Sequence, residues 1–301
     1  MTCILYAQNQ LITYTVPSDG VELKDDFTVR VRQSGSGWKE VVTYPMKVDE
    51  VRQTKHHVEL ASMGYFDFSG QVEVSVTYNK GEVKSGRVRP LSYGITPQIS
   101  CSTMTFTLDR PRNLSIEVNG DIFHNLHLFA NPIDENRPKK LKDKNLIYFA
   151  PGIHQLPDTL NVPSGKTVYV AGGAIVRGCI RAVNARDVKI LGRGEVHPEG
   201  RGAGISIINS RNIYVEGLIT TQCPTGGSDS VTIRNVKAVS SYGWGDGMNV
   251  FASNNVLFDG VFCRNSDDCT TVYATRMGFH GGCRNVTMQN STLWADVAHP
   301  I

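Results

Sequence analysis

Short apolar runs recur through the second half of the chain and limit the folds open to it. Each run follows a polar residue and ends at glycine or asparagine, as in TVYVAGG, DVKILGRG, NIYVEGL, SVTIRNV, NVLFDGV and NVTMQNS. Their anchor residues, Val168, Val188, Ile213, Val231, Val256 and Val286, are 20, 25, 18, 25 and 30 residues apart. One such unit cannot bury its apolar side alone, so we expect successive units to stack into a solenoid.

The composition of the runs selects the kind of solenoid. They are four to six residues long, rich in valine and isoleucine, and lack a helical period, which excludes helical repeats. A leucine-rich repeat is the main alternative, but its L-x-x-L-x-L spacing is absent. The sequence therefore predicts a right-handed parallel β-helix over residues 146–301.

Residues 1–110 follow a different pattern, of short alternating strands separated by polar turns. The candidate strands are ILYAQNQLITYTV, DFTVRVRQ, EVVTYPMKV, VEVSVTY and GRVRPL, with SGSG and NKGE as turn signals. This pattern predicts a β-sandwich. Residues 111–145 are predicted to connect the two parts, with two strand-like runs followed by a charged, solvated linker over residues 134–145. The whole chain is thus expected to be all-β.

Composition and hydropathy bear on the binding partners and the cellular location of the protein. The 301 residues carry 31 Lys and Arg against 28 Asp and Glu, a net charge of +3 without a basic block, so no nucleic-acid partner is expected. No apolar run approaches the length of a membrane span, and the N-terminus lacks a basic segment followed by an apolar one. We therefore expect no membrane partner and a cytoplasmic location. Nothing in the sequence indicates an oligomeric state.

The cysteines and two histidines are predicted to be structural or exposed. The seven cysteines, an odd number without a C-x-x-C pair, are expected to be reduced and buried rather than to form disulfides or a zinc site. They are Cys3, Cys101, Cys179, Cys223, Cys263, Cys269 and Cys283. His56 and His57 lie in the charged stretch TKHHVEL and are expected on the surface.

Three aspartates are spaced to act together. Asp246, in YGWGDGMNV, precedes Asp267 by 21 residues and Asp268 by 22, which is one coil of such a solenoid. Strands of adjacent coils lie about 4.8 Å apart, so the three carboxylates can meet at one patch. Neighbouring side chains of a regular strand point to opposite faces, so presenting both Asp267 and Asp268 outward requires a strand end or a bulge. Alone, the pair would also fit a solvated turn.

Such a cluster has two chemical uses. Glycoside hydrolysis needs one carboxyl group that keeps its proton and another that is ionised to activate water, and crowding like charges separates the pKa values. Calcium binding instead needs ionised oxygens throughout. The spacing alone does not decide between them.

The second half resembles glycoside hydrolase family 28, the polygalacturonase-like enzymes, over about residues 145–301. The strand motifs of that family are N-T-D, D-D, G-H-G and R-I-K. Trp244-Gly245-Asp246 occupies the first position and Asn265–Cys269 the second, with the separation found in the family. Ala298-His299-Pro300 aligns with the third, where only the histidine is retained. The fourth is absent because the sequence stops at Ile301, so we expect a fragment that lacks its last coils.

The resemblance implies an inverting glycosidase without a cofactor or metal ion, acting on a carbohydrate of the pectin type. Asp267 would be the general acid, while Asp246 and Asp268 would activate water. His299 would orient the acid or contact substrate. Trp244 replaces the Asn of the family and would be either a platform for a sugar ring or a cap over the solenoid. Without R-I-K, the cationic groups expected to bind galacturonate are missing.

Other functions stay open. The dextranases, which also join a β-sandwich to a β-helix and use an aspartate cluster, make an α-glucan substrate an alternative. A calcium-dependent polysaccharide lyase or epimerase would share the fold, and a carbohydrate-binding solenoid would explain the repeat but not the aligned aspartates. The remaining polar candidates, Asp229, Arg276, His280 and Asp296, are expected to be turn, loop or surface residues, with Cys263 and Cys269 in the solenoid interior.

Overall fold

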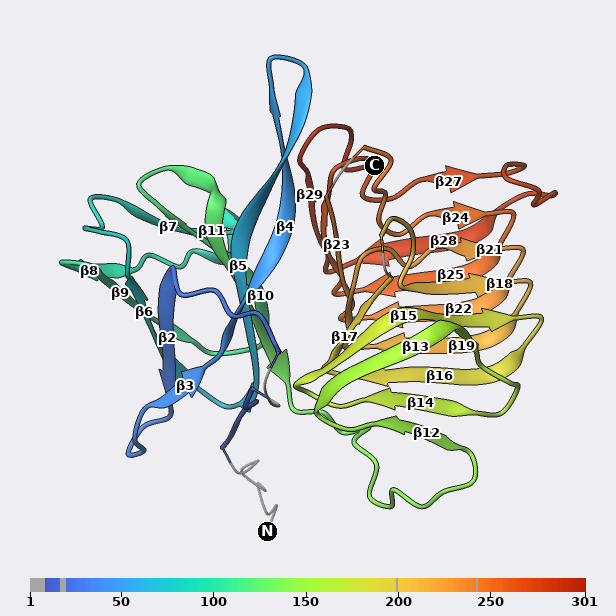
Figure 1. Ribbon diagram of the computed structural model, residues 1–301, viewed down its shortest axis with the longest axis horizontal. Helices are drawn as coiled ribbons and strands as arrows, with labels where there is room; N and C mark the ends of the chain where they lie inside the picture. Colours follow the sequence, from blue (N-terminus) through green and yellow to red (C-terminus); the bar gives the residue numbers. More distant parts are fainter. Residues whose placement is uncertain (1–8, 17–19, 199, 242) are drawn as a thin grey trace, which may run out of the picture. The chain divides into compact units, whose positions relative to one another are not determined.

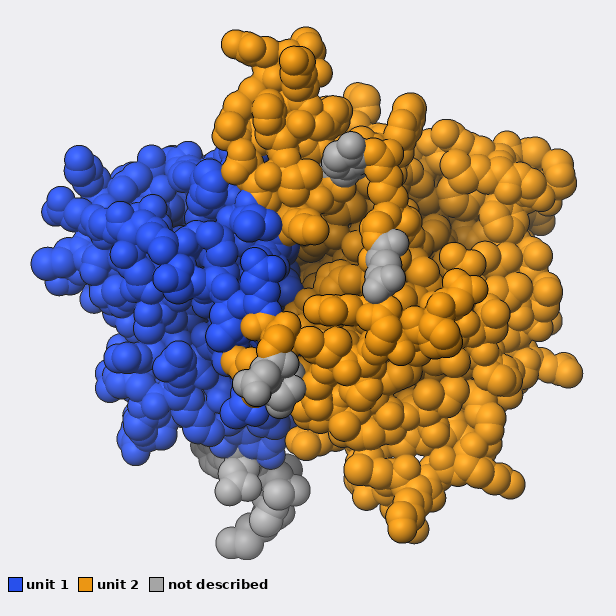
Figure 2. Space-filling model, in the orientation of Figure 1, with its two compact units in different colours: residues 1–15, 22–46, 60–135 blue, residues 16–21, 47–59, 136–301 orange. Residues whose placement is uncertain are grey.

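The computed structural model describes residues 9–16, 20–198, 200–241 and 243–301 (Figure 1). In these residues the regular structure is β-strand, apart from one turn of 3-10 helix at Leu91–Tyr93. The chain divides into two compact units, residues 1–15, 22–46 and 60–135, and residues 16–21, 47–59 and 136–301 (Figure 2). No helix within the described ranges is long and apolar enough to cross a membrane.

The first unit is a β-sandwich of two sheets, as predicted. Its apolar core joins Val29, Val74 and Met104 of one sheet to Phe66 and Leu114 of the other. The first sheet has the order β1 (Gln10–Thr13), β5 (Lys55–Ser69), β11 (Asp121–Pro132), β10 (Arg112–Val118) and β7 (Gly86–Arg89), with β4 (Thr43–Arg52) also paired to β5. The second has the order β3 (Lys39–Val41), β2 (Phe27–Arg32), β6 (Val72–Tyr78), β9 (Thr103–Leu108) and β8 (Gln98–Ser100).

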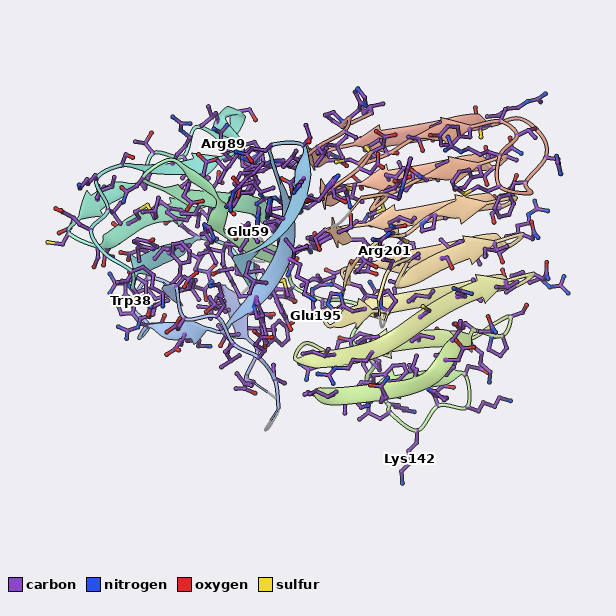
Figure 3. The ribbon with its side chains drawn as sticks, turned by 45° about the horizontal axis from the view of Figure 1, so that its top comes forward. Trp38, Glu59, Arg89, Lys142, Glu195 and Arg201 are labelled. Carbon is purple, nitrogen blue, oxygen red and sulfur yellow. The ribbon has the colours of Figure 1, made fainter. Side chains whose placement is uncertain are left out.

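The structure adds elements that the sequence pattern did not indicate. β5 runs through the stretch that we expected to be merely charged surface, and β8 and β9 were not among the expected strands. β10 and β11, expected in the connection, pair with β7 and β5 inside the first unit. The charged segment after them, residues 133–145, contains no strand, and Lys142 points into solvent there (Figure 3).

The second unit contains a parallel β-helix whose coils cross three faces. The first face stacks β12 (Leu146–Phe149), β14 (Thr167–Val170), β16 (Arg186–Gly192), β19 (Arg211–Glu216), β22 (Asp229–Arg234), β25 (Asn254–Asp259) and β28 (Arg284–Gln289). The second stacks β17 (Glu195–His197), β20 (Ile219–Thr220), β23 (Lys237–Ser240), β26 (Phe262–Asn265) and β29 (Thr292–Ala295). The third stacks β18 (Ile205–Ile208), β21 (Thr225–Gly226), β24 (Val250–Phe251) and β27 (Val272–Tyr273).

Two longer strands begin the second and third faces together. In β15 (Ala174–Val183), residues 175–177 pair with β17 and residues 180–183 pair with β18. β13 (Gly152–Asn161) pairs with β15 along both parts. After β15, each coil has one short strand on the second face and a separate short strand on the third face.

The predicted anchor residues set the alignment of the first face. Ile213 pairs with both Val188 and Val231, and the register continues to Val256 and Val286. Val168 instead faces Ile190, two residues further along β16 and on the same side of the strand. The anchors of the middle coils belong to one continuous apolar core that runs along the inside of the solenoid. The repeat seen in the sequence is therefore the core of the fold.

Polar residues turn the chain at the corners between faces. In five of the six apolar runs the preceding polar residue has a positive φ, between 53° and 59° at Asp187, Asn212, Ser230, Asn255 and Asn285. Asn and Asp adopt this left-handed conformation more easily than other non-glycine residues. The Asn285 amide also donates to the Asn255 side chain at 2.9 Å, so the corners of neighbouring coils are bonded to each other.

The same corner, where the third face leads into the first, also carries a buried ladder of serines. Ser210, Ser228 and Ser253 succeed one another in neighbouring coils, and each is almost fully buried. The hydroxyl of Ser228 donates to the Gly226 carbonyl at 2.9 Å and accepts the backbone N–H of Ser210 at 3.0 Å. The ladder satisfies backbone groups that would otherwise be buried without a partner.

Candidate active site

The three aspartates lie in equivalent loops of two neighbouring coils. Asp246 lies in the loop between β23 and β24, and Asp267 and Asp268 lie between β26 and β27. Because β26 ends at Asn265, both members of the pair follow a strand end, as their expected exposure requires. Each of the three residues is partly exposed.

Backbone hydrogen bonds place the three aspartates beside one another. Asp267 donates its N–H to the Gly245 carbonyl at 3.2 Å, and Gly247 donates its N–H to the Asp268 carbonyl at 2.9 Å. These bonds flank Asp246 on both sides. The next coil continues the row, because Cys269 donates its N–H to the His299 carbonyl at 3.0 Å. The structure thus brings Asp246, the aspartate pair and His299 together from three successive coils.

Asn265 and Gly247 hold these loops in place, and sequence reasoning missed their role. The buried Asn265 amide donates to the Ser240 hydroxyl at 2.8 Å and to the Asp246 carbonyl at 3.1 Å. A Cβ on Gly247 would lie 2.4 Å from the Cys269 carbonyl oxygen and 2.5 Å from Asn265 Oδ1, so only glycine fits. Their positions, inside NSDD and directly after Asp246, were the available signal.

The surroundings of Asp246 favour its protonated form. Burial raises the pKa of the Asp246 carboxyl above its usual value, and the negative charges of Asp267 and Asp268 raise it further. The Asn249 amide, which donates to this carboxyl, and the charge of Arg276 act in the opposite direction. The cluster therefore contains one carboxyl that keeps its proton to a higher pH than an isolated aspartic acid.

His299 and Trp244 lie at the border of the cluster. His299 donates its backbone N–H to Asp268 Oδ1 at 3.2 Å, and its Nδ1 lies 3.5 Å from the same oxygen. Trp244 is 82% exposed and has a left-handed backbone, with φ of 65°. A side chain this exposed cannot cap the solenoid, so the sugar-platform interpretation remains.

The other polar candidates divide into exposed and buried residues. Arg276 and His280 are exposed as expected, with the Arg276 guanidinium 4.0 Å above the Tyr273 ring. Asp229 begins β22 instead of lying in a turn. Asp296 lies in a bend directly after β29, as expected of a turn or loop residue, but its carboxylate is buried. Its side chain is only 1% exposed and binds the buried Arg264.

The cysteines also differ in how far they are buried. Cys223, Cys263 and Cys269 are buried in the solenoid core, as predicted, and all six cysteines in the described ranges are free thiols. Burial raises the pKa of Cys223 and of Cys269 to about 12, so neither is a reactive thiolate. Contrary to the prediction, Cys101 is exposed, and Cys179 and Cys283 are only half-buried. Cys3 lies outside the described residues.

Metal binding has no prepared site in this arrangement. Over the residues that the structure describes, no three His, Cys, Asp or Glu side chains are grouped so that they could hold a metal ion.

The sequence matches no family model and none of the curated proteins. Among solved structures, Dex49A from Penicillium minioluteum is similar with a TM-score of 0.50 and 12% identity, over 93% of this chain and 80% of that one. The family 28 exopolygalacturonase of Yersinia enterocolitica gives 0.43 and 10%, over 74% and 67%. The catalytic domain of a GH87 alpha-1,3-glucanase in complex with nigerose gives 0.38 and 13%, over 92% and 66%. At 12% identity, the likeness to Dex49A shows a shared fold.

Proposed function

We propose that this protein is a glycoside hydrolase that cleaves a polysaccharide or oligosaccharide with its aspartate cluster. The observation that carries the proposal is the convergence of Asp246, Asp267 and Asp268 in neighbouring loops, beside the exposed indole of Trp244. Like charges held together separate their pKa values, and acid–base hydrolysis of a glycosidic bond needs that separation. A binding protein has no such need.

The proposed roles follow the motif positions. Asp267 protonates the leaving oxygen, while Asp246 and Asp268 activate a water molecule on the opposite face of the sugar, so the anomeric configuration inverts. In this assignment Asp246 must be ionised at the working pH, despite the raised pKa. His299, through its contacts with Asp268, positions that carboxylate or contacts the sugar.

We propose that the choice of substrate depends on the indole of Trp244 and on the positive charge of Arg276. The exposed indole offers an apolar face on which a sugar ring can stack. The Arg276 guanidinium is the cation whose charge acts on Asp246, and it could bind the carboxylate of an acidic sugar. A pectin-type polysaccharide is therefore our first choice, and an α-glucan is the alternative.

The test is the release of reducing ends from polygalacturonate, rhamnogalacturonan and dextran, with and without a chelator. We expect release from one of them that resists the chelator and disappears in Asp267→Asn. Asp229→Asn, which alters a carboxylate on another face of the solenoid, is the matched control and should retain activity. Chelator-sensitive release with unsaturated products would indicate a lyase instead, and binding without any release would indicate a carbohydrate-binding solenoid.

A further inference from the structure

A hairpin in the first half of the chain brings a histidine to the loop that carries Asp246. The strands β4 and β5 are joined by Gln53 and Thr54, whose φ angles of 49° and 66° are those of a two-residue type I′ turn. Residues 47–59 of this hairpin belong to the second unit. The turn fixes the register, and His56 Nδ1 lies 2.7 Å from Asp49 Oδ2.

Buried groups tie this pair to the last coil of the solenoid. The Asp49 side chain has no exposed surface, and the Asp49 backbone N–H donates to Asp296 Oδ2 at 3.3 Å. Asp296 in turn donates its own N–H to the Asn265 carbonyl at 2.7 Å. Because the Asn265 amide also bonds the Asp246 carbonyl, one connected set of hydrogen bonds holds both His56 and the Asp246 loop.

The other edge of the imidazole faces the Asp246 loop. A Cβ built on Gly243 would lie 3.8 Å from His56 Nε2 and 3.9 Å from its Cε1, and Gly243 directly precedes Trp244. The His56 side chain is 40% exposed, and Nε2 forms no hydrogen bond with any described residue. In the tautomer whose Nδ1–H donates to the Asp49 carboxylate, Nε2 is the ring nitrogen that is left to accept a hydrogen bond from a ligand.

We propose that His56 is a substrate-binding residue, and the inference rests on the glycosidase function proposed above. Its Nε2 accepts a hydrogen bond from a hydroxyl group of the sugar that stacks on Trp244, next to the sugar attacked at the aspartate cluster. The buried Asp49 acts as a positioning residue that fixes the ring orientation. The hairpin thereby contributes a subsite for neutral hydroxyl groups to a site otherwise built from solenoid loops.

Two substitutions of His56 separate its two nitrogens. In His56→Asn the amide can still donate to Asp49 but nothing replaces Nε2, whereas in His56→Gln the side-chain oxygen can reach the Nε2 position. Affinity is measured by calorimetry in the Asp267→Asn background, with short oligosaccharides of polygalacturonate, rhamnogalacturonan and dextran. We expect His56→Asn to bind about five- to tenfold more weakly and His56→Gln to recover most of the loss. His57→Ala, at the exposed neighbouring histidine, should bind like the parent.

Measurements of turnover distinguish a failure of the proposed role of His56 from a failure of the proposed glycosidase function. In the otherwise wild-type chain, His56→Asn should raise KM by a similar factor and leave kcat nearly unchanged. Hydrolysis by the wild type together with unchanged binding by His56→Asn, or an equal loss in His57→Ala, would overturn the role of His56 alone. If the wild type neither binds nor cleaves any of the three polysaccharides, the proposed function fails and the role of His56 fails with it.

Discussion

At Asp246 a carboxyl group is held partly away from water and next to two neighbours of the same charge, and the Asn249 amide and the Arg276 charge partly offset both effects. If Asp246 activates water, its ionisation sets the acid limb of the pH profile of kcat/KM. Because its pKa is raised, this limb should lie above the usual range of an aspartic acid.

Substitution of Arg276 tests that assignment. Arg276→Gln removes a positive charge that favours the ionised form, so the pKa of Asp246 rises and the acid limb moves to higher pH. The measurement is kcat/KM against pH in both proteins, with Lys189→Gln on the first face as a control that should not move either limb. If the alkaline limb moves instead, Asp246 is the proton donor and the roles of the aspartates exchange.

Gly247 is the residue on which the alignment of the loops depends. In Gly247→Ala the new methyl group would overlap the Cys269 carbonyl and the Asn265 amide, so the two loops must separate. We expect at least about 1 kcal/mol lower stability and about 10- to 100-fold lower kcat/KM. Gly282→Ala is the control, since a Cβ there meets no atom within 4 Å. Equal effects of both substitutions on kcat/KM would contradict this account.

Among the elements, the corners between faces determine how one coil sits on the next. Ser228→Ala would leave the Ser210 N–H without its acceptor inside the solenoid. We expect a loss of about 1–3 kcal/mol in the free energy of unfolding, measured with denaturant. Ser164→Ala removes the same kind of contact, a hydroxyl that accepts the Arg186 N–H at 3.0 Å, but at an exposed corner where water can substitute. Its cost should be clearly smaller, and equal losses would mean that burial is not the cause.

Period and composition were enough to predict six strands on the first face of the solenoid, but not the short strands of the other two faces. The anchor residues are valines and isoleucines because each faces its counterpart in the coils above and below, so the repeat in space is visible in the sequence. The aspartates could be placed for the same reason, since residues one coil apart become neighbours. β8 and β9 carry no comparable signal, because each acquires its pairing partners from the sheet and not from a repeat.

Over the whole molecule, the parts that sequence reasoning missed depend on contacts between distant residues. Asp49 and Asp296 are 247 positions apart, and no local pattern indicates that they meet. Asp296 itself lies in a polar stretch typical of a loop, and only the structure shows that Arg264 binds its carboxylate in the interior. His56 was correctly expected at the surface, but its orientation toward the Asp246 loop follows from that distant contact.

Breaking the Arg264–Asp296 pair should therefore lower stability far more than its place in the sequence suggests, because it leaves a buried charge unpaired. Asp296→Ala removes the carboxylate bound by a guanidinium whose exposed fraction is 0%, and we expect a loss of about 3–5 kcal/mol in the free energy of unfolding. Asp229→Ala breaks an exposed contact with Arg211 at 3.9 Å and should cost less than about 1 kcal/mol. A small effect of Asp296→Ala in urea unfolding would show that water reaches Arg264 freely.

The first face keeps its register although the intervals between its anchors range from 18 to 30 residues. Much of that variation is taken up in the connections, among them residues 266–271 and 274–283. Loops can therefore be lengthened, shortened or exchanged between descendants of one ancestral chain without disturbing the stacked strands. A lineage with this architecture can change what its loops bind, while selection on the corners preserves the scaffold.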